Sequence, residues 1–294
     1  MADLATLCDQ TLDVLYGTGY WEHPKEDTLS AAIADASTTT MTPATPSMWK
    51  RDYLCEFPAT DEVVRIADDA VTTATIRRGQ LGTTAAAQAL GAVMVQNPPF
   101  PRIKVKDEIE RALRNEFWPH VWTWHRDSFT FTQGTATYEL DDHIDDVTVV
   151  YQANIESDGQ FHPLHPGWWD VERQIDDATN KRWLIVHKVY DPDSDVEIIA
   201  RRRPHPDDLA NISDEIADMV PLITAARMMQ KRGASIRQSQ PRSQLDRDGQ
   251  MMRDYRAMVA EFIRQRDQLH RLLMEEVRPD MRWRPATRAF RRSW

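Results

Sequence analysis

The sequence is poor in cysteine. Its 294 residues include only Cys8 and Cys55, which lie far apart and belong to no C-x-x-C pair. Such a spacing implies neither a disulfide framework nor a zinc site. We therefore expect two reduced, partly buried thiols.

Long apolar runs are also missing. No run approaches the roughly 20 residues that span a bilayer, and the first ten residues are acidic rather than basic. The composition, with 41% hydrophobic and 28% charged residues, is that of a folded protein rather than a fibrous or disordered one. We expect a sizeable core, no secretion signal and no membrane segment.

The common catalytic motifs do not occur either. The sequence has no G-x-S-x-G, no phosphate-binding P-loop, no H-E-x-x-H and no G-x-G-x-x-G. Residues 191–197 alternate carboxylates as calcium loops do, but they lack the central glycine and the final glutamate. Residues 141–146, DDHIDD, place paired carboxylates beside a histidine. We expect both segments to be charged turns, and we assign no catalytic residue, metal ligand or cofactor site.

Two histidines and two tryptophans gather in residues 162–169, HPLHPGWW. His162, His165 and Trp168 support a rival hypothesis, an enzyme that binds a metal ion or stacks a sugar on its indoles. A proline after each histidine predicts instead a rigid turn whose aromatic side chains fill the edge of a core. The enzyme remains the alternative.

The net charge of −10 is unevenly distributed. Residues 1–70 and 134–200 carry −9 and −11, whereas residues 71–133 and 201–294 carry +3 and +7. An acidic body with a basic C-terminal third can bind partners of opposite charge through different surfaces.

The most basic stretch is residues 278–294, which hold six arginines and a single acidic residue. Pro279 and Pro285 predict that this stretch is extended and docks on an acidic, grooved partner through arginine and aromatic anchors. Binding of nucleic acid is the alternative. The candidate docking residues are Arg278, Arg282, Trp283, Arg284, Arg288, Phe290, Arg291, Arg292 and Trp294.

Hydrophobic periodicity and chain breakers together predict an α+β fold: a helical core with two β-rich insertions and a long C-terminal helix followed by an extended tail. The predicted segments are an N-terminal helix (1–27), a small β-rich module (28–97), a linker and core helix (98–126), a second β-rich region (127–206), C-terminal helices (207–277) and the extended docking tail (278–294).

Four helix boundaries follow from local signals. Gly17 ends the first helix, and the core helix starts at or near Asp107. The next helix ends at Gly233 and either kinks at Pro221 or begins near it. Residues 234–246 are polar and predict a flexible connection. The last helix keeps near-heptad apolar steps, interrupted by Arg266 at an expected apolar position.

Residues 75–93, TIRRGQLGTTAAAQALGAV, resemble a recurrent element of phage structural proteins: a strand, an R-G-x-x-G-T-T-A-A-A loop and a returning strand. Glycines suit a tight reversal in which φ is positive. Residues 106–122, 138–150 and 212–232 further resemble the helix, the strand pair and the alanine-rich helix of the head-tail adaptor (connector, head-completion) proteins of long-tailed bacteriophages. The candidate loop residues are Arg78, Gly79, Gly82, Thr83 and Thr84.

The resemblance implies a non-enzymatic virion protein without cofactor or membrane. Adaptors form a ring, usually of twelve copies, that joins the portal of the head to the tail and lets DNA pass. The implied partners are copies of itself, the portal protein, the next neck or tail-completion protein, and genomic DNA that passes without specific binding. The implied location is the neck of the virion, after assembly in the host cytoplasm. Another tail or baseplate component is the alternative.

Overall fold

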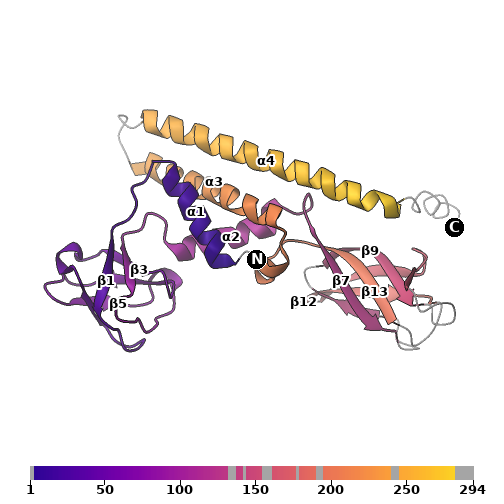
Figure 1. Ribbon diagram of the computed structural model, residues 1–294, viewed down its shortest axis with the longest axis horizontal. Helices are drawn as coiled ribbons and strands as arrows, with labels where there is room; N and C mark the ends of the chain where they lie inside the picture. The colour runs from indigo at the N-terminus through magenta and orange to yellow at the C-terminus, as the bar shows by residue number, and fades with distance from the viewer. Residues whose placement is uncertain are drawn as a thin grey trace. The chain divides into compact units, whose positions relative to one another are not determined.

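The computed structural model has an α+β fold with four α-helices, a closed six-stranded barrel and two smaller sheets among its described residues, which confirms the predicted fold class (Figure 1). The described residues are 3–131, 137–141, 144–153, 161–176, 179–189, 195–239 and 245–281. The chain divides into two compact units. The barrel unit comprises residues 3–111 and 220–260, and the sandwich unit comprises residues 112–219 and those from 261 onward.

Six short antiparallel strands close the barrel in the order β1-β2-β5-β4-β3-β6. The first and last strands pair, with Glu26 opposite Val95, so closure removes the free edges that a small sheet would otherwise expose. The strands are β1 (Glu26–Ala31), β2 (Thr40–Pro43), β3 (Leu54–Phe57), β4 (Glu62–Ile66), β5 (Ala74–Arg77) and β6 (Val93–Gln96).

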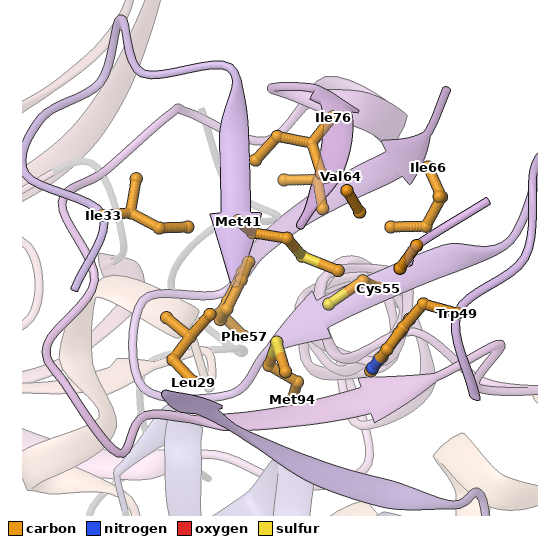
Figure 2. Packing of buried hydrophobic residues seen from close by; sticks show 12 residues of the cluster. Leu29, Ile33, Met41, Trp49, Cys55, Phe57, Val64, Ile66, Ile76 and Met94 are labelled. Carbon is orange, nitrogen blue, oxygen red and sulfur yellow. The ribbon is translucent and has the colours of Figure 1, made fainter. Parts of the chain in front are cut away.

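Apolar side chains from all six strands fill the barrel, as Figure 2 shows around Met41, Phe57 and Met94. Both cysteines are free thiols. Cys55 is fully buried among these side chains and Cys8 is fully buried in the first helix, so both are more buried than predicted. Burial raises the pKa of Cys8 to about 12 and also raises that of Cys55. Neither thiol is therefore a nucleophile at neutral pH.

Helix α1 (Leu4–Gly17) confirms the first predicted helix, with Asp3 as its N-cap. Helix α2 (Arg102–Glu116) starts five residues before Asp107, so that predicted boundary is wrong. The Pro101 carbonyl accepts hydrogen bonds from the backbone N–H groups of Lys104 and Val105, in the first turn of α2. Pro101 can precede the helix because the N–H that it lacks is not needed there. Val105, which is fully buried and lies four residues before Ile109, was the signal for the earlier start.

The N-terminus of α2 is capped from the barrel. Glu56, on β3 and only 2% exposed, accepts a hydrogen bond from the backbone N–H of Arg102. Burial raises the pKa of Glu56 to about 7, although the Arg102 N–H and the charges of Arg102 and Lys106 favour the anion. The buried carboxyl that links the barrel to α2 therefore changes its protonation near neutral pH.

This raised pKa predicts a pH dependence of stability. The pKa of Glu56 is about 4.5 in the unfolded chain and about 7 in the folded protein, so folding favours the protonated carboxyl. This contribution to stability is fully present below pH 4.5 and is lost as the pH rises through 7. The loss amounts to about 3 kcal/mol. Glu56→Gln, which stays neutral and keeps an acceptor for the Arg102 N–H, is expected to remove this slope from denaturant unfolding measured between pH 4.5 and 8. Glu26→Gln, at an exposed position on β1, should leave it unchanged.

In the described part of the sandwich unit, seven antiparallel strands form two sheets, ordered β10-β9-β13-β7 and β11-β12-β8. Val150 and Ile198 from the first sheet share one core with Leu140 and Leu184 from the second, which confirms an antiparallel second β-rich region. The strands are β7 (Thr123–Thr130), β8 (Thr137–Leu140), β9 (Ile144–Ala153), β10 (Phe161–Pro163), β11 (Trp169–Asp176), β12 (Thr179–Val186) and β13 (Asp195–Arg202).

Helix α3 (Asp214–Ser239) includes Pro221 and continues six residues beyond Gly233. The beginning near residue 220 and the end at Gly233 are therefore both wrong. A proline in the second turn removes one backbone hydrogen bond and does not stop a helix of 26 residues, and glycine is only a weak breaker when strong helix formers surround it.

Helix α4 (Leu245–Met281) is 37 residues long and starts within the stretch predicted as a flexible connection. Residues 240–244 of that stretch lie outside the described residues. The helix also continues through Pro279, so the predicted break there is wrong. Within the described residues, no helix combines the length and apolar character that crossing a membrane requires.

Candidate interaction surfaces

The loop that carries the R-G-Q-L-G motif turns through three residues with positive φ. The φ angles are 62° at Gly79, 57° at Leu81 and 85° at Gly82, so both glycines have the conformation predicted for them. Leu81 adopts this conformation at a cost of roughly 1–2 kcal/mol because its Cβ crowds the backbone. The side chain of Leu81 remains 40% exposed. The loop therefore holds a leucine outward in an unfavourable backbone conformation.

Arg78 fastens the start of this loop to the barrel. Its Nε and Nη2 donate to the two carboxylate oxygens of Glu62 at 2.6 and 2.7 Å. Nη1 donates to the carbonyls of Asp35 and Thr38 at 3.1 and 2.9 Å, and the Ala86 carbonyl accepts from Nη2. The side chains of Arg78 and Glu62 are 8% and 0% exposed. Arg78 thus ties three chain segments together from within.

Glu62 is satisfied by further donors. Its carboxylate accepts from the Ala86 N–H at 3.2 Å and from Gln88 Nε2 at 3.1 Å. Burial by itself raises the pKa of Glu62, but the hydrogen bonds from Arg78 and Ala86 outweigh it, and the pKa lies below its usual value. The carboxylate is therefore ionised and paired, which makes this cluster a structural clasp rather than an acid-base site.

The other predicted loop residues divide between support and surface. The hydroxyl of Thr83 accepts from the Val63 N–H at 3.0 Å and donates to the Gln80 carbonyl at 2.8 Å. A Cβ at Gly79 would lie 3.0 Å from the Thr83 carbonyl oxygen, so this close approach requires glycine. Thr84 is exposed.

A pocket of about 550 Å³ lies beside Leu81. Apolar side chains form one part of its wall, including Phe100 from the proline-rich linker and Met228 from α3. Four cations and two carboxylates form the rest. The pocket, called the barrel pocket below, is lined by Leu81, Pro99, Phe100, Pro101, Lys104, Asp107, Glu108, Arg111, Met228, Lys231 and Arg232.

The carboxylates of the barrel pocket already have partners. Glu108 is 1% exposed; Arg227 Nε donates to its Oε1 at 2.5 Å, and Lys231 donates to its Oε2. Lys104 lies 3.2 Å from Asp107. The rim is therefore positive overall, and it suits a partner that presents an apolar group beside an acidic one.

A second hollow, of about 290 Å³, lies between α3 and α4 within the sandwich unit. This volume is at the lower limit of small-molecule sites, roughly 300–1,000 Å³, and matches a side chain better than a cofactor. The hollow, called the acidic groove below, is lined by Glu215, Asp218, Met219, Gln265, Gln268, Leu269 and Leu272.

The acidic groove combines fixed negative charge with exposed apolar surface. The backbone N–H of Glu215 and the Ser213 side chain hydrogen-bond the Glu215 carboxylate and lower its pKa, so it stays ionised. Leu272 is 52% exposed at the groove, so it offers apolar surface beside these carboxylates.

Of the candidate docking residues, only Arg278 falls within a described element, the last turns of α4, so residues 278–281 are helical rather than extended. The remaining candidates lie outside the described residues: Arg282, Trp283, Arg284, Arg288, Phe290, Arg291, Arg292 and Trp294.

In the His162–Trp168 region, on which the rival enzyme hypothesis rests, two side chains make local contacts. His165 Nδ1 accepts from the Gly167 N–H at 3.1 Å, which fixes the turn. The Lys188 ammonium lies 4.6 Å above the Trp168 ring and occupies a face that a sugar would need. In the described part of the chain, no group of three or more His, Cys, Asp or Glu side chains is placed to hold a metal ion.

Residues 141–146 are not all turn as predicted, because β9 begins at Ile144, and carboxylates at both ends of the segment face arginines. Asp141 accepts from Arg202 at 3.0 Å, and Asp146 lies 3.7 Å from Arg201. Asp142 and His143 lie outside the described residues, as do residues 191–194 of the calcium-like run, whose residues 195–197 belong to β13 rather than to a turn.

Sequence reasoning did not find Leu81 or the barrel pocket. An apolar residue between two glycines of a surface loop was the available signal for Leu81. The pocket had none, because the residues that line it lie far apart in the sequence. Comparison with protein-family models and with curated proteins gave no match to this chain.

Proposed function

We propose that this protein is a structural virion component, a head-tail adaptor whose ring joins the portal of a phage head to the tail. The observation that carries the proposal is the loop at residues 78–83. Its clasp is buried and fully paired, and its only exposed large apolar side chain, Leu81, stands beside a preformed pocket with a positive rim. That arrangement suits contact with another protein, and the motif that builds it is the one that resembles phage structural proteins.

A ring of this kind needs two different surfaces on each copy. Heterologous contacts close into a ring when the rotation per subunit divides a circle. The positive barrel pocket and the acidic region of residues 134–200 provide charges of opposite sign for such contacts. Acidic surface facing the channel would repel DNA phosphate and let the genome pass without binding.

Imaging and mass measurement test the proposal directly. Purified protein, alone and mixed with the candidate portal, is expected to give closed rings in negative-stain images and a ring mass in light scattering. A protein that stays monomeric in both conditions would contradict the adaptor function. Turnover of a small molecule with dependence on His165 would favour the enzyme instead.

Leu81 provides a sharper test of the contact surface. Leu81→Gly is expected to leave the free energy of unfolding unchanged or raise it by up to about 1 kcal/mol, because the positive φ no longer opposes a Cβ. The same change should weaken assembly at least tenfold, since burying a leucine contributes about 1.5–3 kcal/mol. Leu90→Ala, at a 68% exposed leucine outside the pocket, is the matched control and should assemble normally.

A further inference from the structure

Building on the proposed ring, we propose that residues 282–294 of one copy bind in the acidic groove of the adjacent copy. The chain then carries both halves of its own lateral contact. The proposal names a neighbouring copy, rather than the portal, as the acceptor of the arginine-aromatic segment.

The chemistry of the two halves is complementary. Residues 282–294, RWRPATRAFRRSW, hold five arginines, three aromatic residues and no acidic residue. The groove offers the carboxylates of Glu215 and Asp218 and the amides of Gln265 and Gln268. Guanidinium groups bind carboxylates through two parallel hydrogen bonds, which gives both affinity and geometry.

The apolar part of the groove suits the aromatic part of the segment. Met219, Leu269 and the half-exposed Leu272 form an apolar strip between the polar groups. Tryptophan and arginine are the side chains that most often dominate interface energy when they fill such a pocket. An indole over Leu272 would cover apolar surface that is otherwise in contact with water.

The length of the segment and the contacts that the proposed ring requires favour an adjacent copy as the acceptor. The segment follows Met281, nine residues and about 14 Å of helix beyond Leu272. Binding in its own groove would turn the segment back along α4 and would supply no contact between copies, which the proposed ring requires. Thirteen extended residues span at most about 43 Å, which is enough to reach a neighbour.

Complementary variants of the full chain test this contact. The groove variant Asp218→Arg with Gln268→Arg changes two exposed positions and keeps Glu215 at the start of α3. The segment variant replaces the five arginines of residues 282–294 with glutamine, which cannot pair with the arginines of the groove variant. Each variant alone is expected to be monomeric, with wild-type thermal unfolding. A 1:1 mixture should form heterodimers and stop there, because only one groove and one segment remain functional.

The control and the contrary outcomes are distinct. Asp13→Arg with Asp68→Arg makes a comparable change of charge at exposed positions of the barrel unit and should assemble as the wild type does. Leu272→Ala should weaken assembly at least tenfold without affecting folding.

If wild type and both main variants all form rings, the groove contact is refuted and the adaptor function stands. If the segment variant forms rings but fails to bind portal, the acceptor is the portal. A wild type that forms no ring with or without portal would refute the adaptor function itself.

Discussion

Replacing Arg78 with alanine is expected to lower the free energy of unfolding of the barrel unit by about 3–5 kcal/mol. The guanidinium is the ionic partner of Glu62 in the clasp, and it also satisfies the carbonyls of Asp35, Thr38 and Ala86. Without it, a carboxylate that is 0% exposed loses its charge partner. Losses of this size come from leaving one member of a buried pair uncompensated, rather than from the intrinsic strength of the pair.

Chemical denaturation of Arg78→Ala beside Arg77→Ala measures the effect. Arg77 is the adjacent arginine and is exposed, so its removal should change stability by no more than about 0.5 kcal/mol. A loss below 1 kcal/mol for Arg78→Ala would show that the clasp does not hold the loop.

The same clasp determines how acid affects the barrel. Because the folded pKa of Glu62 is lowered, its contribution to stability is present above the unfolded value of about 4.5 and is lost as the pH falls below that value. In Arg78→Ala the acid-induced loss of stability should be smaller. Glu56 acts in the opposite direction, so the two carboxyls can be distinguished by the sign of the pH dependence.

Truncating Phe262 is the second large expected effect, a loss of about 3–5 kcal/mol in the sandwich unit. The ring is 1% exposed and packs edge to face against Phe117, which is fully buried, with a centroid distance of 5.4 Å. Arg266 lies one turn further along α4, 5.8 Å from the Phe262 ring, and its Nη1 donates to the Glu116 carbonyl at 3.3 Å. Phe262 is therefore the main apolar anchor of this part of α4.

Thermal and denaturant unfolding of Phe262→Ala compared with Ile263→Ala tests this anchor. Ile263 is the next residue on the helix but is 41% exposed, so its truncation should cost less than about 1 kcal/mol. Equal effects of the two changes would contradict the packing of α4 described here. Loss of ring formation is also expected for Phe262→Ala, since α4 supplies one wall of the acidic groove.

Local patterns were enough to predict most individual elements. Apolar alternation and turn residues indicated both β-rich regions, and the near-heptad steps from Met252 to Leu273 indicated the long helix. These signals work because burial of one face imposes a period on the sequence. Boundaries failed at Asp107, Gly233 and Pro279, where single breakers were given more weight than the surrounding helix formers.

Arg266 shows why a break in a pattern needs the fold for its explanation. In the sequence it is a charge at an expected apolar position. In the structure its charged end lies at the last turn of α2 and donates to the Glu116 carbonyl, at the negative end of that helix. No local property of α4 could indicate that a helix end lies there.

The sequence by itself determined the α+β class, the buried thiols, the glycine conformations at 79 and 82 and the uneven charge, because each depends on composition or on neighbouring residues. Only the tertiary structure decided that the strands of the first module close into a barrel, that Arg78 binds Glu62, that Leu81 stands beside a positive pocket, and that α3 and α4 enclose an acidic groove. Those features join residues separated by up to about 150 positions, and such pairings arise from packing of the whole chain rather than from any local propensity.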